Sequence, residues 1–256
     1  MPMQFDPFKP EDLSSETEFE AAVKLFGGLR ITDLLGADPA FKNADWAFPR
    51  RRAIVEHKEL KANFVTAPSF QESEILLRLK YIEQGKANLF GSPKNPEAAR
   101  EFANDYIHLY RKPLRRIVES ASKQLRESRK QIGWKIGRNI LVLSNRSLTE
   151  ILPLGVCIVL EGILTDIPLN IDGIAYVTNH YVDIPGSDLA NVLWLPVYSR
   201  EHVPKLATID FVDRFGEVFL REVGRSRGDP PESYSQQRSG TPSAMNVLLG
   251  RPIKRD

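Results

Sequence analysis

The chain has 256 residues, of which 42% are hydrophobic and 27% are charged, and its formal net charge is +2. These values fit a globular protein that can bury a sizeable core, and they exclude recognition of a polyanion through overall charge alone. The single cysteine, Cys157, excludes an intramolecular disulfide. The N-terminus has acids and prolines where a secretory signal needs a basic start and an apolar run. We therefore expect a cytoplasmic protein with no membrane partner.

The first half of the chain is expected to contain helices and one hairpin. Residues 1–13 are interpreted as a flexible leader. The segment "SSETEFEAAVKLFGGL" (14–29) has a serine cap, early acids and a closing glycine pair, which are typical of an amphipathic helix. Two short apolar runs, 46–48 and 53–55, are joined by "PRR". Apolar residues at helical spacing then predict helices over 70–83 and 97–110.

The second half alternates between strands and helices. Pro113 begins a long amphipathic segment that ends near Gly133, which predicts a helix over 113–132. The run "NILVLSN" (139–145) suits a buried strand, whereas 150–164 is expected to be helical, with a strand as the alternative. Further expected elements are strands over 171–179 and 191–198, the latter at an edge because it contains Pro196, and a helix over 211–223.

This order of elements predicts an α/β fold with a mixed central sheet and helices on both faces. The folded domain is expected to span 14–223. From residue 224 the composition shifts to Arg, Ser, Gly, Pro and Gln, so 224–256 are interpreted as a disordered tail. One apolar patch in it, "MNVLLG" (245–250), is a candidate for docking on a partner protein or on a second copy of the chain.

The hairpin places charges where an apolar strand should continue. If Arg50 and Arg51 form the turn, Asp45 falls opposite Glu56, and directly opposed residues share one face with Cβ atoms roughly 5 Å apart. Lys58 is two residues beyond Glu56 and shares that face, while the His57 side chain points away. The alternative is an exposed hairpin edge with solvated charges, but such an edge does not need the unbroken apolar run at 53–55.

Two carboxylates this close repel each other unless a cation neutralises them. Mg²⁺ (or Mn²⁺) takes oxygen ligands and keeps several waters, so Asp45 and Glu56 are candidate metal ligands, together with the backbone carbonyl of His57. Lys58 is then positioned to orient or deprotonate a water, or to stabilise charge on an attacked phosphate.

The arrangement resembles the PD-(D/E)xK nuclease superfamily, whose fold is the three-layer restriction-endonuclease-like core. The matching residues are "ADW" (44–46) and "VEHKEL" (55–60), with Ala44 in place of the usual proline. The helix containing "ASKQLRESRKQIG" and the strand "NILVLSN" follow in the family's order, so the resemblance covers roughly 14–180. The D…ExK pattern is weak alone and gains weight from its strand–turn–strand setting.

The resemblance implies catalysis by Asp45, Glu56 and Lys58. It also implies a Lys or Gln from the third helix, which maps onto Lys123 or Gln124, with Gln124 as our choice. Some members add an acid from the first helix, for which Glu20 is chosen and Glu16 is the alternative. A role in host defence or in a mobile element is a further expectation from the resemblance.

A basic helix supports a polyanionic substrate. Residues 111–138 carry ten basic and two acidic residues, a net charge of +8, so the rest of the chain has a net charge of −6. Such a stripe can follow a phosphate backbone, although a solvated helix face is the alternative. The candidate nucleic-acid-binding residues are Arg115, Arg116, Lys123, Arg126, Arg129 and Lys130.

The sequence therefore predicts a metal-dependent endonuclease that hydrolyses phosphodiester bonds in DNA, with RNA as the alternative substrate. The competing hypothesis is a non-catalytic module that keeps the nuclease fold and only binds nucleic acid or protein.

Overall fold

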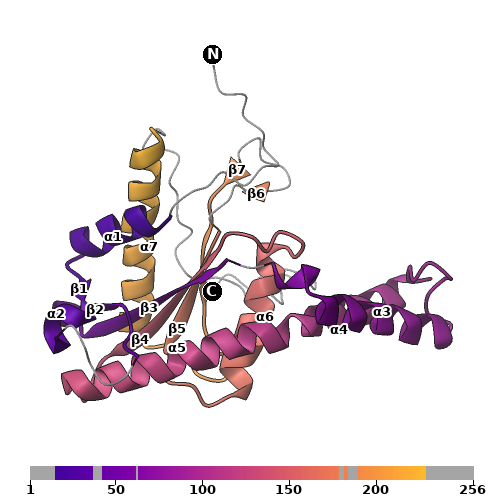
Figure 1. The fold of residues 1–256 in the computed structure, drawn as a ribbon, viewed down its shortest axis with the longest axis horizontal. Coiled ribbons are helices and arrows are strands. Elements are labelled where there is room, and N and C mark those ends of the chain that lie inside the picture. Colours follow the sequence, from indigo (N-terminus) through magenta and orange to yellow (C-terminus); the bar gives the residue numbers. More distant parts are fainter. Residues whose placement is uncertain (1–14, 37–41, 62, 179–181, 184–189, 229–256) are drawn as a thin grey trace.

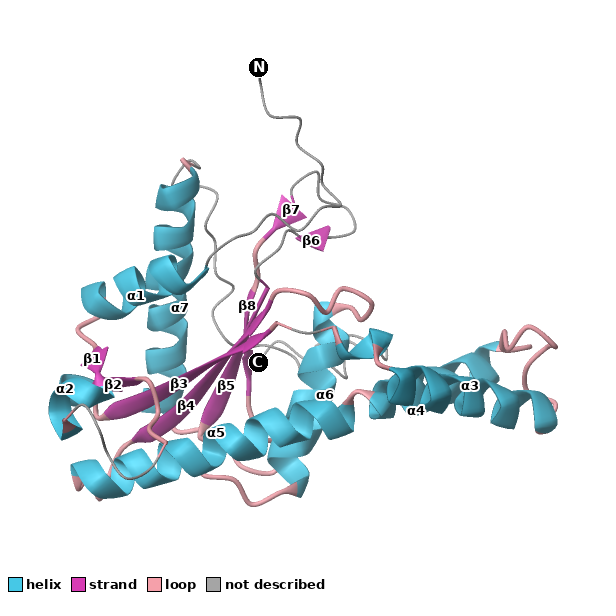
Figure 2. Cartoon of the chain, viewed as in Figure 1, coloured by secondary structure: helices cyan, strands magenta, loops and turns pink. Residues whose placement is uncertain are grey.

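The computed structural model describes residues 15–36, 42–61, 63–178, 182–183 and 190–228. At its centre lies a six-stranded sheet in the order β1-β2-β3-β4-β5-β8 (Figures 1 and 2). The pairs β3/β4 and β4/β5 are parallel and the other pairs are antiparallel, so the sheet is mixed. The strands are β1 (Leu29–Arg30), β2 (Trp46–Phe48), β3 (Ala53–Leu60), β4 (Arg138–Asn145), β5 (Gly173–Thr178) and β8 (Trp194–Val197), and β6 (Val182–Asp183) and β7 (Ala190–Asn191) form a separate pair.

Helices cover both faces of this sheet, as the sequence predicts. The aromatic side chains of α1 and α7 pack on one face with Val55 and Val142, and the apolar side chains of α5 and α6 pack on the other with Leu141 and Leu143. The helices are α1 (Ser15–Leu25), α2 (Ile31–Leu35), α3 (Pro68–Glu83), α4 (Pro96–Leu109), α5 (Arg111–Ile132), α6 (Pro153–Asp166) and α7 (Leu206–Arg227), with short 3₁₀ turns at Pro49–Arg51 and Phe64–Thr66.

The central strands are continuous apolar runs because both of their faces are buried. All six residues of β5 are buried, and so are seven of the eight in β4. Parallel strands need long crossover connections, which are usually helical. Here α3, α4 and α5 connect β3 to β4, and α6 connects β4 to β5. The strand predicted over 191–198 is shorter in the structure: Trp194–Val197 forms β8 at the sheet edge, as its proline predicts, whereas Asn191 belongs to β7 in the separate pair.

The predicted hairpin register is confirmed. Trp46 pairs with Val55 and Phe48 with Ala53, and the same register places Asp45 opposite Glu56. The turn is a 3₁₀ segment over Pro49–Arg51, and Arg52 then adopts a left-handed conformation with φ of 47°. The turn therefore uses one more arginine than we expected.

Several boundaries differ from the sequence prediction. Helix α5 begins at Arg111 rather than at 113, which leaves Pro113 in the first turn, where its missing N–H costs no hydrogen bond. The segment 150–164 is helical, as α6. The expected tail from 224 is wrong at its start, because α7 continues to Arg227 and ends on the left-handed Gly228. The leader 1–13, the Ser14 cap, and the remaining tail with its patch at 245–250 lie outside the described residues.

The α3–α4 pair forms an arm that projects away from the sheet (Figure 1). Its outer part has a small core of its own around Leu77, Tyr81 and Ala87. None of the described helices combines the length and the apolar character that a bilayer-spanning helix requires.

Candidate functional site

The hairpin and α5 bring together two carboxylates and one ammonium group. Asp45 immediately precedes β2, and Glu56 and Lys58 lie on the face of β3 that α5 covers. The Glu56 side chain is fully buried (0% exposed) and its Oε1 forms an ion pair with Lys58 Nζ. Lys58 keeps 23% of its side chain exposed, and Asp45 is half-buried, so both of these groups reach solvent while Glu56 does not.

Asp45 is held in place from several sides. Its Oδ2 accepts a hydrogen bond of 2.8 Å from the backbone amide of His57, and its backbone carbonyl accepts one of 3.0 Å from Ile31. The neighbouring backbone is fixed by α5: the side-chain amide of Gln124 donates to the Asn43 carbonyl at 2.7 Å, and the Ala44 amide donates to Ser128 Oγ at 2.8 Å. The Asp45 carboxylate thus accepts the His57 amide hydrogen bond that a backbone carbonyl would accept if β2 continued to pair with β3 before Trp46.

Burial disfavours the ionised form of both carboxylates. It raises the pKa of Glu56 from 4.5 to about 7, and the nearby Asp45 charge raises it further, while Lys58 opposes the shift. Burial also raises the pKa of Asp45, against the opposing effects of the His57 amide, Lys58 and Arg30. Sites of this kind are frequently functional, because a folded protein gains nothing in stability from a buried carboxylate beside a second acid.

The donor set fits a hard divalent cation. Among the described residues, Glu56 Oε2 is buried and has no hydrogen-bond partner. The amide and carbonyl of one strand residue point to the same side, so the His57 carbonyl lies on the Asp45 side of β3. Two carboxylates and one carbonyl match the oxygen ligands that Mg²⁺ prefers, with water completing its shell. Within the described residues no group of three or more His, Cys, Asp or Glu side chains could hold a metal, so protein ligation would depend on this small set.

The His57 side chain lies on the opposite face of β3, as the strand alternation predicts. Its ring stacks on Phe19 of α1 with centroids 4.2 Å apart, and its Nε2 shares a hydrogen bond of 2.8 Å with Ser144 Oγ. Burial, with the Lys58 and Lys61 charges, lowers the pKa of His57 to about 4. The imidazole is therefore neutral at pH 7 and belongs to the packed face.

The acids of the first helix do not join the pair through any contact among the described residues. Glu20 accepts from Lys24 at 3.1 Å and from Arg30 at 3.2 Å, and these cations lower its pKa. Arg30 in turn lies over the Trp46 ring, 4.3 Å from its centroid, and lowers the pKa of Asp45. Arg30 thus forms an ion pair with Glu20 and acts on Asp45 through its charge. The Glu16 side chain is exposed on the same helix.

The structure gives Gln124 a positioning contact and adds a residue that sequence reasoning missed. Gln124 holds the backbone next to Asp45, while Lys123 is exposed. Ser128, one turn further along α5, holds the next residue of the same loop. The sequence contains an indication of this role, because Gln124 and Ser128 are polar residues four apart on the mostly apolar, buried face of α5.

The six candidate nucleic-acid-binding residues of α5 fall into two groups. Three are already engaged: Arg115 pairs with Glu119, Arg126 pairs with Glu127, and Arg129 donates to the carbonyls of Trp134 and Lys135. The other three are exposed and have no polar partner among the described residues, namely Arg116, Lys123 and Lys130. This second group is the one available to a phosphate backbone.

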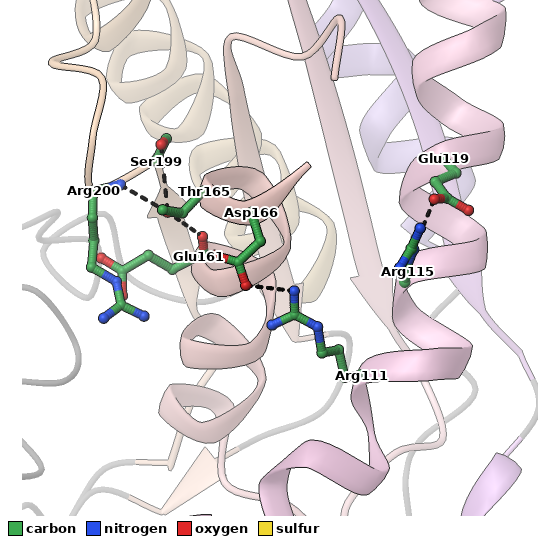
Figure 3. Close-up of polar contacts among 8 residues, drawn as sticks. All are labelled: Arg111, Arg115, Glu119, Glu161, Thr165, Asp166, Ser199 and Arg200. Atoms are coloured by element: carbon green, nitrogen blue, oxygen red, sulfur yellow. Dashed lines mark hydrogen bonds and ion pairs between the residues drawn. The ribbon is translucent and has the colours of Figure 1, made fainter. Parts of the chain in front are cut away.

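A separate hollow of about 1010 Å³ lies between α4 and α6. Two of its arginines form ion pairs: Arg111 pairs with Asp166 at 2.7 Å, and Arg200 pairs with Glu161 at 3.2 Å (Figure 3). Burial raises the pKa of Glu161, and Arg200 opposes that shift. The two remaining charged residues of the lining, Arg100 and Glu201, have opposite signs, so the hollow has no excess of positive or negative charge.

Comparison with protein-family models, with curated proteins and with solved structures gave no match. The assignment of function therefore depends on the fold and the site geometry of this chain.

Proposed function

We propose that this protein is a metal-dependent nuclease that hydrolyses phosphodiester bonds in DNA, built on a restriction-endonuclease-like core. The observation that carries the proposal is the Asp45–Glu56 pair, in which Glu56 is fully buried and Asp45 is half-buried, with Lys58 on the same strand face as Glu56. Glu56 is fully buried, its pKa is raised to about 7, and one of its oxygens has no hydrogen-bond partner among the described residues. This combination is costly for folding and useful for binding a cation.

The order of elements supports the same proposal. A leading helix is followed by three antiparallel strands, a crossover that ends in a helix, and a fourth strand parallel to the third. That is the order in which the PD-(D/E)xK superfamily places its core. In this chain it puts the D…ExK residues on the second and third strands and Gln124 on the crossover helix.

The residues divide the chemistry between them. Asp45, Glu56 and the His57 carbonyl would hold the divalent ion, which when bound lowers the pKa of a coordinated water and offsets charge on the phosphate. With the ion in place, the Lys58–Glu56 ion pair would break. The Lys58 ammonium group would then stabilise the negative charge that develops during phosphodiester cleavage, or orient the attacking water. Gln124 and Ser128 keep Asp45 in position from α5. The exposed cations of α5 would contact the phosphate backbone beside the site.

The direct test is cleavage of supercoiled plasmid by the purified protein with Mg²⁺ or Mn²⁺ and with EDTA, alongside single-stranded RNA. Glu56→Gln should abolish cleavage and weaken metal binding measured by calorimetry. The matched control is Glu59→Gln, which neutralises an acid on the same strand but on the opposite face, where Glu59 pairs with Lys61. That control should cleave and bind metal as the wild type does.

Three outcomes decide the proposal. Cleavage of RNA but not of plasmid DNA would identify RNA as the substrate, with the proposed mechanism unchanged. Nucleic-acid binding without cleavage under either metal would favour the non-catalytic module. Metal binding of equal strength in the wild type and Glu56→Gln would contradict the shared-ion site.

A further inference from the structure

A second polar site lies at the other end of β3, where the hairpin turns. A pocket of about 420 Å³ is formed by the hairpin turn, the start of β4 and the first turns of α7. Five of its lining residues are cationic, namely Arg50, Arg51, Arg52, Arg138 and Lys205. The one acidic residue in the lining, Asp210, is paired with Arg214 at 2.7 Å. The pocket is therefore strongly and almost uniformly positive.

Two of the five cations are part of the scaffold. Arg51 donates to the Phe26 carbonyl at 2.7 Å and lies over the Phe26 ring, and Arg138 donates to the Arg51 carbonyl. The side chains of the other three, Arg50, Arg52 and Lys205, are exposed and have no polar partner among the described residues. Three unneutralised cations thus line one hollow, in contrast to the hollow beside α6, where Arg111 and Arg200 are paired with acids.

The backbone conformation at position 52 does not favour an arginine. Arg52 is the one non-glycine residue with positive φ in the described part of the chain, and its conformation is one that Gly or Asn adopts more readily. Its carbonyl accepts from the Arg138 amide at 2.8 Å, and a side chain at Gly137 would come within 2.9 Å of that carbonyl. The left-handed backbone costs stability, and no ion pair of the Arg52 side chain among the described residues offsets that cost.

The first turn of α7 adds to the positive potential. This 22-residue helix begins beside the pocket, and its N-cap residue, Lys205, makes no side-chain capping bond. The amino end of a helix carries partial positive charge and free amide donors. Three free cations and a helix end exceed what a single phosphate dianion neutralises, so the matching ligand carries at least two phosphoryl groups.

We propose that the pocket formed by Arg50, Arg52, Lys205 and the first turn of α7 binds linked phosphate groups. Two sources supply this chemistry: a small polyphosphate such as a nucleoside triphosphate, and successive phosphates of a nucleic-acid strand. The proposal does not depend on the nuclease function, because the pocket shares no residue with the Asp45–Glu56 site and requires no divalent ion.

The test is calorimetric titration of the full-length chain in EDTA, once with sodium tripolyphosphate and once with a short single-stranded oligonucleotide. Arg52→Asn keeps a residue that tolerates the left-handed conformation and removes the charge, so binding should weaken about tenfold. Lys205→Gln should weaken binding by a similar factor without affecting the fold, because this side chain is exposed. Lys94→Gln removes one exposed charge from the arm and should leave binding unchanged.

A further variant separates function from structure. Arg52→Gly relieves the backbone strain, so we expect the Tm to rise by about 2–4 °C while anion binding falls as in Arg52→Asn. Binding of tripolyphosphate that depends on Arg52 and Lys205 supports a small ligand, and binding of the oligonucleotide alone with the same dependence supports a strand. Absence of binding in both titrations, or binding that is indifferent to both substitutions, would overturn the proposal.

Discussion

Polar side chains on the two faces of β3 lie in opposite environments. On the face toward α1 and α7, the imidazole of His57 is stacked on Phe19, bonded to Ser144 and kept neutral by its low pKa. On the face toward α5, Glu56 is fully buried beside Asp45, and one of its oxygens has no hydrogen-bond partner among the described residues. Residues one position apart on the same strand thus lie in a satisfied environment and in an unsatisfied one.

The difference between these two environments indicates which face of β3 serves stability and which serves the proposed function. A buried polar group that finds its partners contributes to a unique packed core, whereas one that does not lowers the free energy of unfolding. The ionised Glu56 therefore lowers the stability of the metal-free protein, and a bound cation would restore it. Substitutions on the two faces should have different consequences, which provides the following tests.

The largest effect is expected from Lys58→Met, which keeps the length of the side chain and removes its charge. Cleavage should fall by about a hundredfold or more, because the developing charge on the phosphate loses its cation. Metal affinity should not fall, since Glu56 loses a competing ion pair. Plasmid cleavage and calorimetric metal titration measure the two quantities. A Lys58→Met protein that cleaves normally would remove the lysine from the mechanism.

The next effect is the stability of Glu56→Gln in EDTA. The folded state holds the Glu56 proton up to about pH 7, whereas the unfolded chain releases it near pH 4.5. The free energy of unfolding of the wild type should therefore decrease as the pH rises through this window, by roughly 3 kcal/mol in total. Glu56→Gln should lack this decrease and be more stable than the wild type above pH 7. Urea unfolding at pH 4.5 and pH 8 measures the difference, and parallel pH profiles would contradict it.

His57→Phe tests the satisfied face. The ring stack on Phe19 is retained and the hydrogen bond to Ser144 is removed, so unfolding at pH 7 should become easier by about 1 kcal/mol. The folded-state pKa of about 4 lies below the ordinary 6.5, so the wild type loses stability as the pH falls from 6.5 to 4. The variant should lose less over that range, and its cleavage should stay close to wild type. A large loss of cleavage would connect this face to the chemistry.

The smallest effect concerns the cations that α5 exposes beside the Glu56 face. Removing one lysine that binds a phosphate of duplex DNA should lower the slope of log affinity against log salt by about 0.9. The double variant Lys123→Gln, Lys130→Gln should therefore show a slope lower by up to about 1.8, measured by fluorescence anisotropy in EDTA. Lys94→Gln on the arm is the control for removing a lysine far from α5, and it should leave the slope unchanged. An unchanged slope would assign both lysines to a solvated face.

Local patterns were sufficient to predict the hairpin and most of the elements. The register followed from the turn and the alternation of residues, so the opposition of Asp45 and Glu56 was accessible from the sequence. The two-residue β1 and the short α2 are too brief to produce a periodic signal. The end of α7 was also missed, because "GRSR" resembles a linker locally but packs as the last turn of a long helix.

The parts of the site that depend on distant residues could not be predicted. The Gln124 and Ser128 hydrogen bonds join α5 to a loop more than eighty residues earlier. The arginine pocket joins the hairpin turn to Arg138 and Lys205, which come together only through the parallel pairing of β3 with β4 and the packing of α7. Such juxtapositions are set by tertiary structure, and no local propensity encodes them.

The separate core of the α3–α4 arm has a consequence for local unfolding. Its outer part is held together by the small core around Leu77, Tyr81 and Ala87. The inner ends of the two helices pack instead into the hydrophobic cluster that α5 and α6 form with the sheet. A unit with so few buried side chains can open without disturbing the sheet. The backbone amides of the outer arm should therefore exchange with deuterium far sooner than those of β3 and β4, as independent subglobal openings rather than through global unfolding.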